Sequence, residues 1–244
     1  MCRHLAHLGP PTPLHDLLFA APHSLAHQAR HPEHQEQPGV NADGWGVGWY
    51  APGATDPERY RTVAPIWEDA AFATRSTHIE STAFLAAARL ASPGAAIDTS
   101  GNAPFRSGPW LFSLNGIVHG FHDDVGRALR SQVSPARRAE IEGDTDSEVL
   151  FAMTLDRLDA GEAPVDALAR VVRDVLAVTT GRINLLLTDG SLIAATRSGR
   201  SLFVRGSTVA SEPLDTDPAW REVVEGGVVL VAGAHTEPIV NVAP

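Results

Sequence analysis

Residues 145–196 read TDSEVLFAMTLDRLDAGEAPVDALARVVRDVLAVTTGRINLLLTDGSLIAAT, and this stretch indicates the fold class. Its first part, Asp146 to Leu158, is apolar on nearly every helical face and opens with a capping-box pattern, which predicts a buried helix. Residues 164–176 are apolar on one face only, which predicts an amphipathic helix. The apolar runs on either side of Asp189-Gly190 predict a β-hairpin.

Shorter strand patterns flank this stretch on both sides. They cover residues 2–8, 40–50, 58–66 and 110–114 before it, and 201–205, 207–211, 227–232 and 237–242 after it. The strand at 110–114 is expected to end at Asn115-Gly116. Strands, then paired helices, then more strands predict an α+β fold without regular βαβ alternation. No long Pro, Gly or Ser linker divides the 244 residues, so we expect one domain spanning 1–244.

The composition argues against several classes of function. The formal net charge of −10 disfavours nucleic-acid binding, because phosphate contacts need clustered cations. All 19 basic residues are Arg, which excludes a lysine Schiff base. The single cysteine excludes an internal disulfide and a cysteine-based zinc finger. Because neither a signal-peptide pattern nor an apolar run of about 18 residues is present, we expect a cytoplasmic protein that binds no membrane. We also expect a protein without a cofactor.

The lone cysteine, Cys2, stands where removal of Met1 would make it the first residue. Cysteine attacks as the thiolate, and a base is normally needed to form it at neutral pH. A free α-amine, with a pKa of about 7.7–8.0, supplies such a base on the same residue. The alternative is an inert cysteine buried in the first strand.

Three other positions carry groups that complement such a nucleophile. Asn115-Gly116 offers a side-chain amide and a backbone N–H for a developing oxyanion, or is an ordinary turn. Arg89 lies in an apolar run, where it needs either a substrate carboxylate or an internal ion pair. Asp146 can hold a substrate ammonium or complement the helix dipole. Together these groups would form a receptor for an α-amino acid.

Six motifs give the chain a resemblance to a known family. They are MCRHLAHLG (1–9), NADGWGVGWY (41–50), ARLASPG (88–94), NAPF (102–105), SLNGIV (113–118) and GDTDSE (143–148). In this order they resemble the class II glutamine amidotransferases, which are N-terminal-nucleophile hydrolases, and among them the stand-alone amidohydrolases of ergothioneine biosynthesis. The resemblance spans essentially the whole chain.

The resemblance implies a four-layer αββα sandwich and hydrolysis of a γ-glutamyl amide such as γ-glutamyl-hercynylcysteine sulfoxide. It implies that Cys2 is the nucleophile and that Asn115 and Gly116 form the oxyanion hole. It further implies that Arg89 binds the glutamyl carboxylate and Asp146 the ammonium group. Ser92 corresponds to a small hydroxyl residue near that carboxylate, and Asn102 has a supporting role. These last assignments depend on the resemblance alone.

Some residues of the motifs allow more than one interpretation. Asp43 and Gly44 either position the glutamyl group or shape a turn. Among the aromatic residues, Trp45 is the one we would expect to face the pocket, and the alternative for it is packing in the core. The histidines His23, His27, His31 and His34 have the spacing of one helix face, and a solvated surface is favoured there over a metal site.

Two other functions remain open at this point. One is a glutaminase subunit that delivers ammonia to a separate synthase, and the other is an inactive amino-acid sensor on the same fold. The expected partner is a small γ-glutamyl molecule. Assembly into a homo-oligomer stays open.

Overall fold

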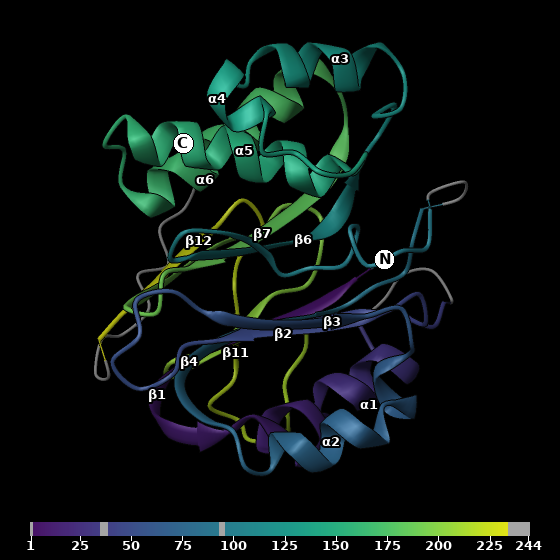
Figure 1. Ribbon diagram of the computed structural model, residues 1–244, viewed down its shortest axis with the longest axis vertical. Coiled ribbons are helices and arrows are strands. Elements are labelled where there is room, and N and C mark those ends of the chain that lie inside the picture. The colour runs from purple at the N-terminus through teal and green to yellow at the C-terminus, as the bar shows by residue number, and fades with distance from the viewer. Residues whose placement is uncertain (1, 35–38, 93–95, 234–244) are drawn as a thin grey trace.

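Two antiparallel β-sheets lie face to face, and helices cover the outer face of each (Figure 1). The structure is a computed structural model that describes residues 2–34, 39–92 and 96–233. One sheet has seven strands in the order β11-β9-β10-β1-β4-β2-β3, and the other has five in the order β12-β8-β7-β6-β5. The predicted α+β class and the αββα layering are therefore confirmed.

The elements have the following bounds. The strands are β1 (Arg3–Pro13), β2 (Trp45–Trp49), β3 (Glu58–Thr62), β4 (Glu80–Ala88), β5 (Phe105–Ser107), β6 (Trp110–Val118), β7 (Gly181–Thr188), β8 (Leu192–Thr196), β9 (Phe203–Arg205), β10 (Thr208–Ala210), β11 (Arg221–Glu222) and β12 (Val228–Ala232). The helices are η1 (Asp16–Ala20), α1 (Leu25–Arg30), η2 (Ile66–Glu68), α2 (Ala70–Ser76), α3 (Asp124–Ser131), α4 (Pro135–Arg138), α5 (Asp146–Asp159) and α6 (Pro164–Val178).

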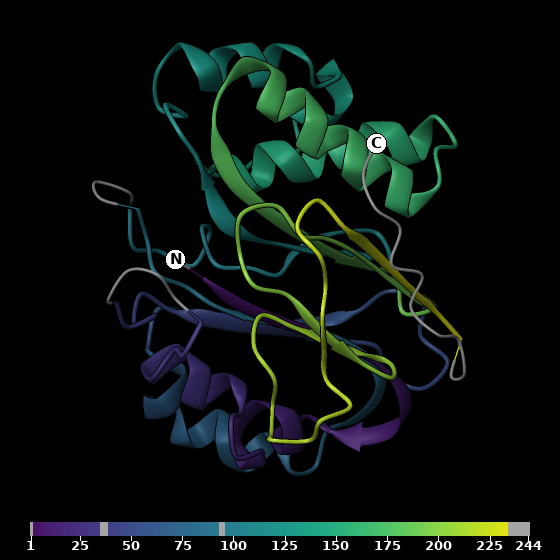
Figure 2. The ribbon, with the colours of Figure 1, turned by 180° about the vertical axis from the view of Figure 1, so that it is seen from behind.

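Separate apolar clusters join the layers. Side chains such as Leu85, Leu111 and Val209 fill the space between the two sheets. A second cluster packs α3, α5 and α6 on the five-stranded sheet, and a third packs η1, α1 and α2 on the seven-stranded sheet. Viewed from behind, the chain leaves the hairpin of β7 and β8, crosses to the other sheet for β9 to β11 and returns as β12 (Figure 2). The backbone therefore connects the two sheets on both of these crossings.

The stretch that indicated the fold class forms the expected elements. Helix α5 begins after Thr145, whose side chain accepts a hydrogen bond from the backbone N–H of Glu148. Helix α6 has Pro164 in its first turn, and β7 and β8 pair as the predicted hairpin. The short elements α4, β5 and β11 had no clear sequence pattern. The predicted strand at 237–242 lies outside the described residues.

Strand β6 corrects one prediction. The strand does not end at Asn115-Gly116 but continues to Val118, with Asn115 opposite Asn184 and Gly116 opposite Ile183 on β7. A Cβ atom at Gly116 would lie 1.7 Å from the carbonyl oxygen of Arg182. Glycine is therefore required here by the close approach of another backbone, and the turn interpretation of this dipeptide is wrong.

Among the described residues, none of the helices combines the length and the apolar character needed to cross a bilayer.

Candidate active site

A cavity of about 330 Å³ brings together residues that are distant in the sequence. Cys2 immediately precedes β1, and its side chain is a half-buried free thiol in the wall of this cavity. The same wall contains Arg89, Ser92, Gly116 and Asp146. Arg89 and Ser92 follow β4, Gly116 lies near the end of β6, and Asp146 begins α5. The structure thus places the predicted nucleophile and both predicted charged groups around one space.

A buried ion pair anchors the chain next to Cys2. The guanidinium of Arg3 lies 3.1 Å from the carboxylate of Glu212, and both side chains are almost fully buried. Glu212 also accepts hydrogen bonds from the backbone N–H groups of Glu33 and His34. Because a buried charge needs such compensation, the pair fixes the first residue of β1 relative to the loop after β10. Cys2 is therefore held at a defined position even though it precedes the first strand.

Arg89 is a buried cation that forms no ion pair within 4 Å among the residues that the structure describes, although its charge helps to lower the pKa of Asp98. Its side chain is 8% exposed. Its Nη2 donates to the carbonyl oxygen of Ala96 at 3.1 Å, and its Nη1 donates to Oδ1 of Asn102 at 3.5 Å. A guanidinium has five N–H donors and binds a carboxylate through two of them. The free donors of Arg89 are suited to a ligand carboxylate in the cavity.

Asp43, Gly44 and Asn102 hold Arg89 from outside the cavity. The carbonyl oxygen of Gly44 accepts from the N–H of Arg89 at 2.8 Å, and Oδ2 of Asp43 accepts from the N–H of Ala91 at 2.8 Å. Gly44 has a φ of +114°, and a Cβ atom there would lie 2.2 Å from Nδ2 of Asn102. None of the three residues is part of the cavity wall described above. Their contacts favour a positioning role for these residues.

Asp146 faces the cavity from the first turn of α5. Its carboxylate accepts hydrogen bonds from the backbone N–H groups of Val118, at 3.0 Å, and Ser147, at 2.8 Å. Burial nevertheless raises the pKa of this carboxyl above its ordinary value of 3.8, and the backbone N–H groups only partly oppose that shift. An ammonium group in the cavity would restore the preference for the ionised form. Asp146 therefore braces the end of β6 while its residue lines the cavity.

The side chain of Asn115 is fully buried beside the cavity, between the lining residues Leu114 and Gly116. Its amide lies 3.1 Å from Oγ of Ser211, which also accepts the backbone N–H of His4 at 3.0 Å. In the orientation in which Nδ2 of Asn115 donates to Oγ of Ser211, the amide oxygen Oδ1 has no hydrogen-bond partner. Rotating the amide by about 180° lets the Ser211 hydroxyl donate to Oδ1 and leaves Nδ2 as a free donor. Ser211 is thus a contact of the candidate residue Asn115 that no sequence motif indicated.

The prediction that Trp45 faces the pocket is wrong. Its side chain is fully buried in the outer core, where Nε1 donates to Oδ2 of Asp69 at 3.2 Å and the ring packs edge-on against Phe72. The reason is the alternation along β2. The glycines between its large residues face the other sheet, and a Cβ atom at Gly48 would lie 2.7 Å from a methyl group of Leu111. Trp45 must therefore point toward the helices.

The histidine-rich segment does not gather its side chains into one site. The rings of His23 and His27 stack at 5.3 Å and those of His27 and His31 lie 5.5 Å apart, whereas His34 packs on Phe203. Within residues 2–34, 39–92 and 96–233, no group of three or more His, Cys, Asp or Glu side chains is arranged to hold a metal ion.

Residues 21–206 match the class II glutamine amidotransferase family. The chain is 36% identical over 240 residues to the γ-glutamyl-hercynylcysteine sulfoxide hydrolase of Mycolicibacterium smegmatis, covering 96% of this chain and 97% of the relative. It is 34% identical over 235 residues to the hydrolase of the same name from Mycobacterium tuberculosis, covering 95% and 93%. A class II glutamine aminotransferase domain protein from Silicibacter pomeroyi has a similar structure, with a TM-score of 0.73, 25% identity and full coverage of both chains.

Proposed function

The chain belongs to the class II glutamine amidotransferases, and from this premise we propose that it hydrolyses the γ-glutamyl amide of γ-glutamyl-hercynylcysteine sulfoxide. The observation that carries the proposal is the single cavity lined by Cys2, Arg89, Gly116 and Asp146. It combines a thiol, a cation and an anion, which are the groups needed to attack a γ-amide while holding an α-carboxylate and an α-ammonium. The substrate is that of the mycobacterial relatives.

Recognition of the glutamyl end depends on charge complementarity between the ligand and the cavity wall. Arg89 binds the α-carboxylate through two parallel N–H donors, and Asp146 binds the α-ammonium. Both contacts are made to groups remote from the scissile bond. They therefore hold the γ-carbonyl near Cys2 in the orientation needed for attack. Asp43, Gly44 and Asn102 keep Arg89 in place through the hydrogen bonds and close packing described above.

The chemical step requires Cys2 to be the first residue. Its α-amine accepts the thiol proton, and the thiolate attacks the γ-carbonyl carbon. The resulting oxyanion accepts hydrogen bonds from the backbone N–H of Gly116 and from Nδ2 of Asn115. When the carbon–nitrogen bond breaks, the protonated α-amine gives its proton to the leaving nitrogen, and a γ-glutamyl thioester remains.

Hydrolysis of the thioester completes the cycle. The α-amine takes a proton from water as the oxygen attacks the thioester carbonyl. The carbon–sulfur bond then breaks, glutamate is released and the proton returns to the sulfur.

Other residues of the cavity wall favour a cationic leaving group. They include Phe121 and the carboxylates of Asp123 and Asp144. Aromatic faces and carboxylates both attract a trimethylammonium group, which is the cationic part of the proposed substrate. Asp144 already contacts Arg130 and His122, so Asp123 is the carboxylate best able to interact with the ligand.

The test is to measure glutamate released from γ-glutamyl-hercynylcysteine sulfoxide and, in parallel, from glutamine. We expect a strong preference for the first substrate and no release by a Cys2→Ala variant. Mass spectrometry of the purified protein should find that Met1 has been removed. Activity on glutamine alone would instead identify an ammonia-donating subunit. Binding of amino acids without turnover, with Met1 retained, would identify a sensor.

A further inference from the structure

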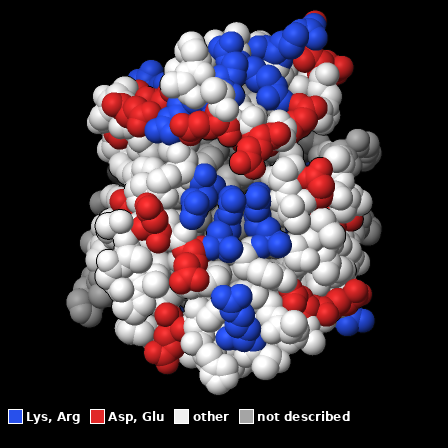
Figure 3. Space-filling view, viewed as in Figure 1, with Lys and Arg blue, Asp and Glu red and all other residues white. Residues whose placement is uncertain are grey.

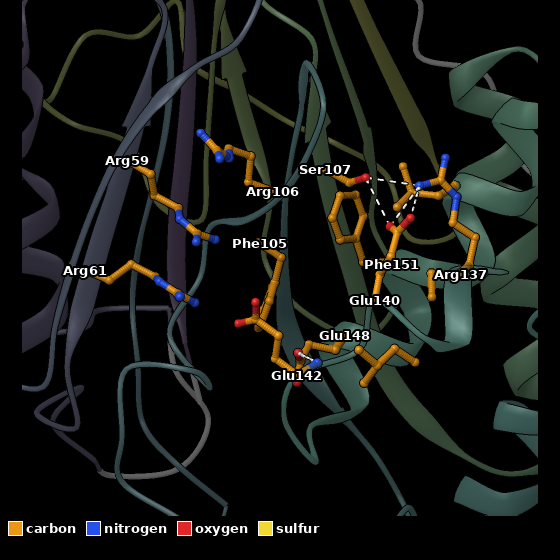
Figure 4. Close-up of a pocket in the computed structure, with 13 residues that line it drawn as sticks. Arg59, Arg61, Phe105, Arg106, Ser107, Arg137, Glu140, Glu142, Glu148 and Phe151 are labelled. Carbon is orange, nitrogen blue, oxygen red and sulfur yellow. Dashed lines mark hydrogen bonds and ion pairs between the residues drawn. The ribbon is translucent and has the colours of Figure 1, made fainter. Parts of the chain in front are cut away.

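A second cavity, of about 80 Å³, opens where the edge strands of the two sheets meet. Arg59 and Arg61 line it from β3, and Arg106 lines it from β5. In Figure 4 the three guanidinium groups point into the same space, and Figure 3 shows basic side chains gathered at the centre of this face. We call the three side chains the arginine cleft. Such a concentration of cations is unexpected in a chain whose formal net charge is −10.

The alternation of β3 explains why two of these cations share one side. Tyr60 lies between them and points the opposite way, where its ring stacks on Phe72 at 4.4 Å. Arg59 and Arg61 therefore project into the gap between the sheets. Arg106 reaches back from the opposite edge, and its Nη1 donates to the carbonyl oxygen of Pro57 at 3.0 Å.

None of the three guanidinium groups forms an ion pair with any residue in the described part of the chain. Arg59 donates to the carbonyl oxygen of Pro104 at 3.4 Å, and Arg61 donates to those of Ser100 and Asn102 at 3.2 Å each. Since each guanidinium has five N–H groups, most of the donors in the cleft remain available. Burial, together with the charges of Arg61 and Arg106, lowers the pKa of Arg59 to about 10. Arg59 is therefore still charged at neutral pH, and the charges of Arg61 and Arg106 repel it.

The carboxylates on the opposite side of the cavity are mostly engaged elsewhere. Glu140 pairs with Arg137 at 2.9 Å, and Glu148 accepts the backbone N–H groups of Glu142 and Gly143. The carboxylate of Glu142 is exposed and lies across the cavity from the arginines in Figure 4. Counted as formal charges, the lining has four arginines against three glutamates, and the charges of Glu142 and Glu148 act on Arg61. The cavity therefore keeps an excess of one positive charge.

We propose that the arginine cleft binds a phosphate group. A single water needs about 10–15 Å³ on this measure of volume, so the cavity of 80 Å³ accommodates a group of about five to eight heavy atoms. A tetrahedral dianion has this size and presents oxygens to several guanidinium groups at once. A guanidinium group can donate two parallel N–H hydrogen bonds to two oxygens of one phosphate. The negative charge of the bound phosphate would also relieve the repulsion among the three cations.

The choice of variants follows from the contacts. Arg61 holds the carbonyls of Ser100 and Asn102, and Asn102 in turn contacts Arg89, so replacing Arg61 would disturb the candidate active site. Arg59 and Arg106 are more exposed and make single backbone hydrogen bonds. The double variant Arg59→Gln/Arg106→Gln therefore tests the cleft. Arg127→Gln/Arg170→Gln is the matched control, because it removes the same charge from exposed helical positions.

The experiment is a calorimetric titration of the full chain with inorganic phosphate in about 0.15 M sodium chloride, where long-range charge effects are screened. We expect one saturable site in the unchanged protein, weakened about tenfold or more in Arg59→Gln/Arg106→Gln, since charge-assisted hydrogen bonds are lost. The control variant should bind within about twofold of the unchanged protein. A parallel titration with glycerol phosphate distinguishes free phosphate from a phosphate ester. If glycerol phosphate binds as tightly as inorganic phosphate or more tightly, the ligand is a phosphate ester. If it binds more weakly, the ligand is the free ion.

Other outcomes would overturn the proposal. Absence of saturable binding by both phosphate probes would do so, as would equal weakening in the control variant or acetate binding as tightly as phosphate. If the double variant fails to fold, Arg106→Lys keeps the charge but loses the fork, and it should weaken binding several-fold with unchanged thermal stability. None of these measurements depends on catalysis, so their failure is distinct from a failure of the proposed hydrolase function.

Discussion

Replacing Asn115 by alanine should separate catalysis from stability. If Nδ2 of Asn115 donates to the oxyanion, its removal should lower kcat about 100- to 1000-fold, equivalent to about 2.7–4 kcal/mol of transition-state stabilisation. KM should change little, because Arg89 and Asp146 hold the substrate by its other end. The backbone N–H of Gly116 remains, so activity should not vanish.

The cost to folding follows from the contacts of the same side chain. Asn115 is fully buried, and its side-chain amide makes one hydrogen bond, to Ser211. The net loss of that bond is worth about 0.5–1.5 kcal/mol, and a small cavity adds about 1 kcal/mol more. The variant should therefore remain folded at 25 °C, which thermal unfolding checks independently of kcat.

Ser211 provides a sharper version of the test. In Ser211→Ala the amide of Asn115 is present but loses the group that orients it, so kcat should fall about tenfold with KM unchanged. Ser113→Ala is the matched control, since it removes another fully buried hydroxyl, one that lies 3.3 Å from Nδ1 of His4. Steady-state kinetics of the three variants with the same γ-glutamyl substrate is the assay. A fully active Asn115→Ala, or equal losses in the two serine variants, would refute the reasoning.

Four further changes have distinct expected outcomes. Arg89→Lys should raise KM about 10- to 100-fold with kcat little changed, because a lysine cannot bind a carboxylate through a paired fork; a fall in kcat alone would contradict this. Affinity of a Cys2→Ala variant for the γ-glutamyl substrate should decrease as pH falls through the raised pKa of Asp146, and calorimetry should find no such decrease when Asp146→Asn is added. Burial lowers the pKa of His4 from 6.5 to about 3, so the unfolded chain binds a proton at a higher pH than the folded protein does. The free energy of unfolding, measured in urea, should therefore fall by up to about 1.4 kcal/mol per pH unit between pH 6.5 and 3. This decrease should be smaller in His4→Gln. Gly116→Ala should prevent stable folding, since its Cβ would overlap the carbonyl oxygen of Arg182, and circular dichroism would show the loss.

Local patterns predicted the elements whose neighbours in sequence are also their neighbours in space. The capped helix α5, the amphipathic helix α6 and the hairpin of β7 and β8 all depend on residues a few positions apart. The side chain of Trp45 was misplaced because its direction depends on which face of β2 meets the other sheet. Asn115-Gly116 has the composition of a turn, but pairing with β7 keeps it in an extended strand.

The sequence alone determined the chemical groups of the candidate site: the thiol of Cys2, the cation of Arg89, the donors of Asn115 and Gly116, and the carboxylate of Asp146. Only the tertiary structure decided that four of these positions line one cavity, that Ser211 contacts the amide of Asn115, and that Arg59, Arg61 and Arg106 converge at a sheet edge. The physical reason is that side-chain chemistry belongs to each residue. Distances between remote residues depend instead on strand register and on the packing of two sheets, which no local pattern records.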